Sequence, residues 1–230
     1  MKRIGLLGGM SWESSSLYYS LINEEVRERL GGLNSASCIM ASVNFADIER
    51  FQRDGDWDAA GNLLAVEAQK LESAGAEVLV LCTNTMHKVA GAIEAAVSIP
   101  FLHLADVTAK AVLASGITTV GLLGTRFTME ESFYADRLAS HGLTVITPDA
   151  EDRAVVNAVI YDELVVGDIR PESRRRFQGI IDRLGKGGAQ GIILGCTEIE
   201  LLISPHDTEL PVFATTRLHA QAAVTAALSQ

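Results

Sequence analysis

The sequence predicts an α/β protein made of two similar parallel-sheet sub-domains that face each other across a cleft. Short apolar runs typical of buried strands alternate with segments of helical apolar spacing along the chain. The run Gly-Leu-Leu-Gly occurs at Gly5–Gly8 and again at Gly121–Gly124, 116 residues further on. Two similar strand ends, at Thr83 and Cys196, are 113 residues apart. These nearly equal offsets indicate a duplicated α/β unit.

Each half shows the same succession of strands and helices. Their alternation favours right-handed crossovers and a parallel sheet. The pattern alone leaves open which half the last strand and helix join. The expected strands are 4–7, 37–43, 77–81, 100–104, 118–123, 144–146, 191–194 and 212–213, and the expected helices are 14–30, 57–74, 89–96, 170–184 and 216–228.

Composition and charge narrow the class of protein. With 230 residues and 48% apolar content, the chain can bury a substantial core. Its net charge of −10 argues against a nucleic-acid partner, and no apolar run is long enough to span a membrane. Three cysteines (Cys38, Cys82 and Cys196) form no disulfide framework, so we expect a reduced, cytoplasmic protein.

A glycine loop and a cysteine follow two of the predicted strands. The loop Gly8–Ser11 either binds an anion through its backbone N–H groups or makes a tight strand-to-helix turn. Cys196 follows a predicted buried strand, at the strand end where open α/β sheets bind ligands. Its thiol could act as a nucleophile or proton carrier; alternatively, Cys196 is a small apolar residue of the core. Glu198 either orients the thiol or is an ordinary acid at a helix N-terminus, and the second interpretation is slightly favoured.

Three motifs taken together resemble the aspartate/glutamate racemase family. They are Ile4–Ser11, Thr83–His87 and Gly195–Glu198, and the resemblance covers nearly the whole chain, including the duplication. The chain is most similar to the branch of L-aspartate/glutamate-specific or broad-specificity amino-acid racemases. The five histidines lack metal-ligand spacing, in keeping with a family that uses neither metal nor pyridoxal phosphate.

The resemblance implies 1,1-proton transfer at the Cα of aspartate, glutamate or a small polar amino acid such as homoserine. Thr83 and Cys196 would be the two proton carriers, and a helix N-terminus would lower the pKa of the Cys196 thiol. The first implied sub-domain contains residues 1–103 and 207–230, and the second contains residues 104–206. Whether the protein forms a homodimer is left open. The implied substrate contacts are Met10 through its backbone, Gln52, Asn84, Thr85, Thr125 and Thr197.

Three positions depart from the family pattern. Thr83 stands where the family has its first cysteine, and side-chain alternation directs the adjacent Cys82 away from the cleft. Val165 replaces a lysine that would pair with a substrate carboxylate, and Ala214 replaces an aspartate. Gln52 suits a neutral polar side chain as well as an acid. Thr83 also keeps two alternatives open: a maleate isomerase or decarboxylase-like enzyme, and a non-catalytic amino-acid-binding protein.

Overall fold

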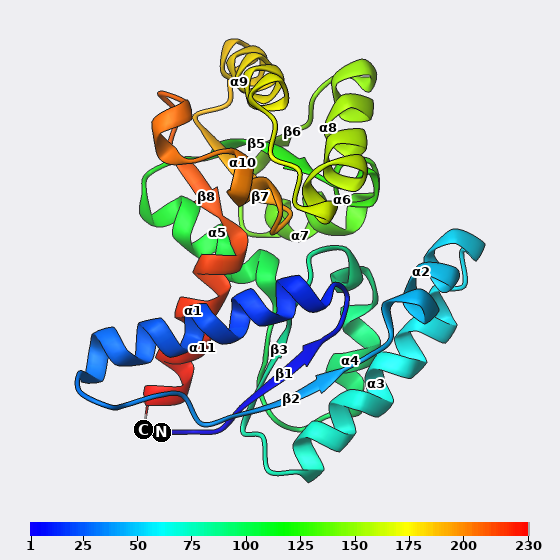
Figure 1. Ribbon diagram of the computed structural model, residues 1–230, viewed down its shortest axis with the longest axis vertical. Coiled ribbons are helices and arrows are strands. Elements are labelled where there is room, and N and C mark those ends of the chain that lie inside the picture. Colours follow the sequence, from blue (N-terminus) through cyan, green and yellow to red (C-terminus); the bar gives the residue numbers. More distant parts are fainter. Residues whose placement is uncertain (230) are drawn as a thin grey trace. The chain divides into compact units, whose positions relative to one another are not determined.

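The computed structural model describes residues 1–229, which form two compact units, each with its own parallel sheet (Figure 1). The first unit contains Met1–Leu104 and the segment from His219 onward, and the second contains Ala105–Leu218. Within the described residues each sheet has four strands, ordered β2-β1-β3-β4 in the first unit and β6-β5-β7-β8 in the second. The identical order confirms the predicted α/β class and supports the duplication.

The first unit surrounds its sheet with helices on both faces. Its strands are β1 (Ile4–Gly8), β2 (Cys38–Ser42), β3 (Val78–Leu81) and β4 (Phe101–Leu102). Its helices are α1 (Trp12–Leu30), α2 (Phe45–Asp54), α3 (Trp57–Ser73), the 3₁₀ turn η1 (Thr85–Val89), α4 (Ala90–Ala96) and most of α11 (Thr215–Leu228).

The second unit repeats this plan. Its strands are β5 (Thr119–Gly124), β6 (Thr144–Ile146), β7 (Gly191–Gly195) and β8 (Val212–Ala214). Its helices are α5 (Leu104–Ala114), α6 (Arg126–Glu130), α7 (Ser132–Ser140), α8 (Ala150–Asp162), α9 (Pro171–Lys186) and α10 (Ile199–Leu202), with 3₁₀ turns η2 (Leu164–Val166) and η3 (Pro205–Asp207).

Alternating side chains of the central strands fill two cores in the first unit. Leu6 and Val80 point to one face, where they pack with α1 and α11, whereas Leu7 and Leu81 point to the other, where they pack with α3 and α4 (Figure 1). Crossovers that leave β1 in one direction and return past it in the other place their helices on opposite faces. Burying one such leucine contributes about 1.5–3 kcal/mol.

The boundary between the units differs from the expected one. Residues 207–218 were expected in the first sub-domain but lie in the second, because the apolar strand β8 pairs with β7 through Ile193 and Phe213. The Thr215 hydroxyl also donates to the Leu194 carbonyl at 2.8 Å. Leu104, expected to end a strand, instead begins α5.

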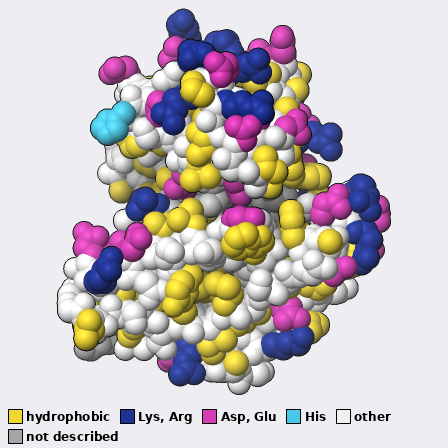
Figure 2. Space-filling model, in the orientation of Figure 1, with side chains coloured by type: hydrophobic (Ala, Val, Ile, Leu, Met, Phe, Trp, Pro, Cys, Tyr) yellow, Lys and Arg dark blue, Asp and Glu magenta, His cyan; other side chains and the backbone are white. Residues whose placement is uncertain are grey.

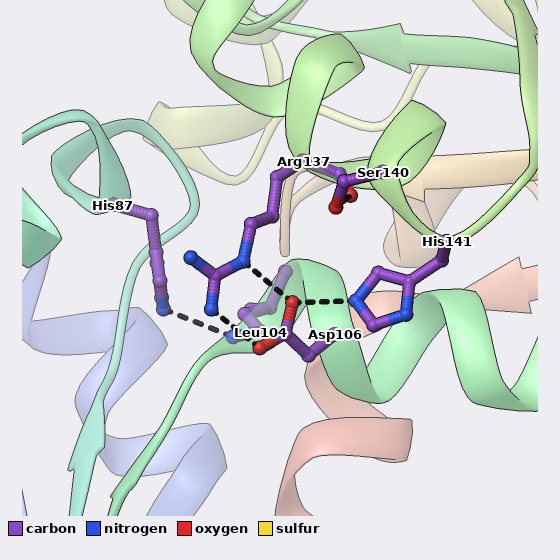
Figure 3. A network of polar contacts seen from close by, with 6 residues as sticks. All are labelled: His87, Leu104, Asp106, Arg137, Ser140 and His141. Atoms are coloured by element: carbon purple, nitrogen blue, oxygen red, sulfur yellow. Dashed lines mark hydrogen bonds and ion pairs between the residues drawn. The ribbon is translucent and has the colours of Figure 1, made fainter.

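A charged cluster joins α5 to α7 within the second unit (Figure 3). Arg137 donates to both carboxylate oxygens of Asp106 at 2.6 Å, and His141 Nε2 lies 2.8 Å from Asp106 Oδ1. A bidentate pair of this kind fixes geometry better than a single contact does. The cluster therefore orients the two helices toward each other.

Charges of both signs are mixed on the surface. On the face that Figure 2 shows, acidic and basic side chains are interspersed with apolar ones over both units. This mixing does not resemble the basic stripe of a nucleic-acid-binding surface. The helices of residues 1–229 include none that is both long and apolar enough to span a bilayer.

Gly9 gives a test of the loop after β1. Its φ of 93° favours glycine, and a Cβ there would overlap the Val43 carbonyl oxygen. Gly142 has nearly the same φ, 91°, but a Cβ there would meet no atom within 4 Å. We expect Gly142→Ala to lower the free energy of unfolding by about 1–2 kcal/mol and Gly9→Ala to lower it by clearly more. Urea denaturation measures both; equal losses would show that the Val43 contact is unimportant.

Candidate active site

The predicted site residues follow the two central strands of each sheet. In the first unit the chain leaves β1 toward one face of the sheet and β3 toward the other, so the direction of the crossovers changes between these two strands. Open α/β sheets bind ligands at such topological switch points. Met10 and Thr83 follow β1 and β3 in the first unit, and Thr125 and Cys196 follow β5 and β7 in the second.

Strand register makes Thr83 the counterpart of Cys196. Leu7 pairs with Leu81 in the first sheet, and Leu123 pairs with Leu194 in the second. Thr83 and Cys196 each lie two residues beyond the paired strand residue. Cys82 therefore corresponds to Gly195, and Thr83 corresponds to Cys196. This correspondence agrees with the sequence motifs, which placed Thr83 at the family's first cysteine.

The environment of Cys82 agrees with a structural role. Its side chain is fully buried in the core with Leu6 and Tyr18. Burial raises the pKa of its thiol far above the ordinary range. Thr83, the next residue, is 8% exposed, and its N–H donates to the Leu81 carbonyl at 2.9 Å.

The glycine loop is held by serines at the start of α1. Ser15 Oγ accepts from the Gly9 N–H at 2.8 Å and donates to the Ser11 carbonyl at 2.8 Å. Ser11 in turn caps α1 by accepting from the Ser14 N–H. The Gly9 amide is thus already bonded inside the loop, so the expected anion contact rests on the backbone of Met10.

Gln52 lies beside the segment that begins at Thr83. Its amide nitrogen is 3.1 Å from Met86 Sδ, and Met10 shares the core of that face with Met86. Arg50 and Arg53 instead form ion pairs with acids on their own helix. Of Arg50, Gln52 and Arg53, Gln52 is therefore the one whose side chain reaches the segment that begins at Thr83. Asn84 and Thr85 are also buried there.

In the second unit, Cys196 directly contacts a carboxylate. Its thiol donates to Glu198 Oε2 at 2.9 Å, and only 7% of the residue is exposed. Although Glu198 occupies the N-cap position of α10, its side chain makes no capping hydrogen bond. The structure thus disagrees with the favoured view of Glu198 as an ordinary helix-terminal acid.

The pKa of the Cys196 thiol is raised well above its ordinary value, not lowered as expected. Burial is the largest cause, followed by the Glu198 charge and the hydrogen bond to it. The backbone N–H groups of Glu198 and Ile199 act in the lowering direction, but burial and the carboxylate outweigh them. Cys196 is therefore a protonated thiol at neutral pH in this environment.

Two threonines, Thr125 and Thr197, follow the same pair of strands, β5 and β7, as Cys196 does. Thr125 caps α6 by accepting from the Thr128 N–H, and it follows Gly124, which pairs with Gly195 on β7. Thr197 lies within 3.3 Å of the Thr216 hydroxyl, which donates to it. Both threonines are buried, with 8% of each exposed.

Two positions at which the sequence departs from the family pattern, Val165 and Ala214, also lie in the second unit. Val165, at the family's lysine position, lies in η2 and is 37% exposed, and η2 packs beside α10 just after Cys196. Ala214 ends β8 and is half-buried. Among residues 1–229, no group of three or more His, Cys, Asp or Glu side chains is arranged to hold a metal ion.

Two residues, Glu198 and His87, contact Cys196 and Thr83 more closely than their sequence motifs indicated. Glu198 contacts the thiol, and a carboxylate two residues after a strand-end cysteine was a signal for this. His87 bonds to the Thr83 carbonyl with Nδ1 at 2.7 Å. The four-residue spacing in Thr83–His87 could have indicated that contact, since η1 begins between the two residues.

Glu198 gives a testable pH dependence. Because its charge raises the thiol pKa, Glu198→Gln should lower that pKa and move the pH profile of Cys196 alkylation to lower pH. Peptide-resolved mass spectrometry after iodoacetamide treatment measures Cys196 separately from Cys38 and Cys82. Glu200→Gln is the matched control, because Glu200 lies two residues further on and does not bond to the thiol. An unchanged profile in Glu198→Gln, or equal shifts in both variants, would contradict this view.

Comparison with known proteins places the chain in a family. The model of the Asp/Glu/Hydantoin racemase family matches residues 7–223. Over 98% of both chains, the sequence is 24% identical to a broad-specificity amino-acid racemase, RacX, of Bacillus subtilis. A crystal structure of a candidate Asp/Glu racemase from Yersinia pestis shares 53% identity with a TM-score of 0.95, covering 100% of both chains. An aspartate racemase homologue from Pyrococcus horikoshii shares 33% identity with a TM-score of 0.89, also over 100% of both chains.

These matches agree with the repeated sheet order and with the motifs at the strand ends. The resemblance noted in the sequence and the enzyme class that it implies, an isomerase of the racemase type, are confirmed. The chain belongs to the Asp/Glu/Hydantoin racemase family.

Proposed function

We propose that the protein is a cofactor-independent amino-acid racemase that inverts Cα by 1,1-proton transfer, with Cys196 and Thr83 as its proton carriers. The observation that supports this most is the strand register, since both residues lie two positions beyond a paired leucine of a central strand. Inversion requires one carrier on each face of a planar carbanion. A duplicated sheet supplies one such strand end from each unit.

Cys196 and Glu198 would act together. The buried thiol is protonated at neutral pH, so it is ready to donate a proton to the carbanion. In the opposite direction Glu198, 2.9 Å away, would accept the thiol proton, and the resulting thiolate would remove the α-proton. The chain thus holds both an acid and a proton acceptor at this end.

Thr83 would be the weaker carrier. A hydroxyl gives up its proton far less readily than a thiol, so the deprotonated form of Thr83 that could remove an α-proton is rarely populated. We therefore expect donation by Thr83 to be easier than abstraction, so that Cα–H exchange is faster for the enantiomer whose α-proton Cys196 removes. The α-carboxylate and amine would be held by the Met10 backbone, Asn84, Thr85, Thr125 and Thr197.

The substrate side chain would be acidic or small and polar, as in aspartate, glutamate or homoserine. Gln52 can donate to a carboxylate or bond to a neutral hydroxyl, and it lies against Met86 near Thr83. Val165 adds no charge beside α10, which weakens the preference for a second carboxylate. The name of the Bacillus subtilis relative, a broad-specificity racemase, agrees with a site that accepts several side chains.

One assay separates this function from its alternatives. The enzyme is incubated in D₂O with each enantiomer of aspartate, glutamate and homoserine, and Cα–H is followed by NMR alongside chiral chromatography. A racemase exchanges the Cα hydrogen with solvent and inverts the configuration at Cα. A maleate isomerase or a decarboxylase-like enzyme acts on its own alkene or malonate substrate without Cα exchange, and a binding protein does neither.

We also propose that the protein is cytoplasmic, because its three free cysteines fit a reducing compartment.

Carrier variants test the assignment of roles. Cys196→Ala should abolish exchange, whereas Thr83→Ala should keep exchange from the Cys196 side and reduce inversion by roughly 10²- to 10⁴-fold. Thr83→Cys should speed racemisation and Cα–H exchange from the Thr83 side by restoring a paired-thiol site. Cys82→Ala is the control, because this neighbouring thiol lies in the core and should affect stability more than turnover. Full inversion by Thr83→Ala would show that another group delivers the proton on that face.

A further inference from the structure

The hydrogen bonds of His87 define which of its ring nitrogens carries the proton. The Leu104 N–H donates to His87 Nε2 at 3.1 Å (Figure 3), so Nε2 is an acceptor without hydrogen. The single proton of the neutral ring is then on Nδ1. Nδ1 lies 2.7 Å from the Thr83 carbonyl oxygen, which accepts that proton. One imidazole ring thus links Thr83 to Leu104.

The surroundings keep this ring neutral. His87 is 3% exposed, and the rings of His103 and His219 lie 4.7 and 5.9 Å from it, centroid to centroid. Burial and these two neighbours hold the pKa of His87 well below its ordinary value. A second proton would also occupy Nε2 and break the bond from Leu104. The Nδ1-protonated form therefore persists through the neutral pH range.

We propose that His87 is a positioning residue that orients Thr83 through the hydrogen bond from Nδ1 to the Thr83 carbonyl. This inference rests on the proposed function, in which Thr83 is a proton carrier. His87 itself makes no contact with the reacting atoms in this scheme. Its role is to hold the backbone from which the Thr83 hydroxyl projects.

The chain around Thr83 shows why this bond matters. The Cys82 carbonyl accepts from Ser14 Oγ at 3.2 Å, and the Thr83 N–H donates to Leu81 at 2.9 Å. The Thr83 carbonyl is the next polar group along the chain, and His87 is its partner. A misplacement of a reacting group by about 1 Å can cost on the order of 10²-fold in rate. Loss of the His87 bond is therefore expected to act on proton delivery by Thr83.

His219 provides a matched control in the same unit. It is also a fully buried histidine bonded at both ring nitrogens, since Nε2–H donates to the Leu102 carbonyl at 2.7 Å and Nδ1 accepts from Tyr18 Oη at 2.9 Å. Burial lowers its pKa to about 4. Neither of its partners belongs to the segment that begins at Thr83. Replacing it should therefore reduce stability without a selective effect on inversion.

Two substitutions separate the two bonds of His87. In His87→Asn the amide nitrogen takes the place of Nδ1, which keeps a donor to Thr83 and loses the acceptor for Leu104. In His87→Gln the longer side chain places its carbonyl oxygen near Nε2, which keeps the acceptor and loses the donor to Thr83. Each variant leaves one backbone group without its partner, so the two should lose similar stability.

The readout is the ratio of inversion to Cα–H exchange, with KM and kcat measured separately. We expect His87→Gln to lower kcat for inversion by about 10- to 100-fold while exchange from the Cys196 side and KM stay close to the parent values. His87→Asn should retain most of the inversion, and His219→Gln should leave the ratio unchanged. Equal ratios in His87→Asn and His87→Gln, or a larger loss in His87→Asn, would overturn the proposal.

A second measurement does not depend on activity, so failure of the proposed racemase function remains distinguishable. Long-range ¹H–¹⁵N spectra of the parent protein should show His87 protonated at Nδ1 and bare at Nε2 between about pH 6 and 8. The amide of Asn84 shares a peptide group with the Thr83 carbonyl, and its signal should move in His87→Gln but not in His87→Asn. The opposite tautomer, or equal movement in both variants, would refute the positioning role even if the parent protein inverts no amino acid.

Discussion

Parallel pairing of the two central strands in each sheet is the constraint on which the rest of the structure depends. The registers Leu7 with Leu81 and Leu123 with Leu194 decide which residue emerges beyond each carboxyl end. A slip of one residue would exchange the core and loop positions of Cys82 and Thr83. In the observed register, Leu6 and Leu7 bury their side chains in separate hydrophobic cores on opposite faces of the first sheet.

The two strand ends then receive different chemistry from their surroundings. Cys196 lies in an apolar environment beside Glu198, so its thiol keeps its proton. Thr83 lies in a segment ordered by three hydrogen bonds: Ser14 donates to the Cys82 carbonyl, the Thr83 N–H donates to the Leu81 carbonyl, and His87 donates to the Thr83 carbonyl. Burial and Glu198 thus set the acidity of Cys196, whereas hydrogen bonds chiefly fix the backbone around Thr83. This difference suits the racemase that we propose, in which Thr83 is the weaker of the two proton carriers.

Buried histidines in the first unit serve as neutral hydrogen-bonding groups. His87 and His219 each use one ring nitrogen as a donor to a backbone carbonyl and the other as an acceptor. Desolvation removes their usual role as charges near neutral pH. Their ability to satisfy a donor and an acceptor at the same time explains why a polar ring can occupy an otherwise apolar core.

The sequence by itself determined the fold class, the duplication and most of the strands, because apolar periodicity and repeated glycine motifs are local signals. It also indicated the racemase family, and strand alternation predicted that Cys82 is buried. Other features depend on neighbours far apart in the chain. Pairing of β8 with β7 moved residues 207–218 into the second unit. The helices α2, α5, α6, α7, α8 and α10 were not among those expected from the sequence. Only the tertiary structure decided the proton state of Cys196, since burial and Glu198 act through space and outweigh the helix terminus that local sequence suggested.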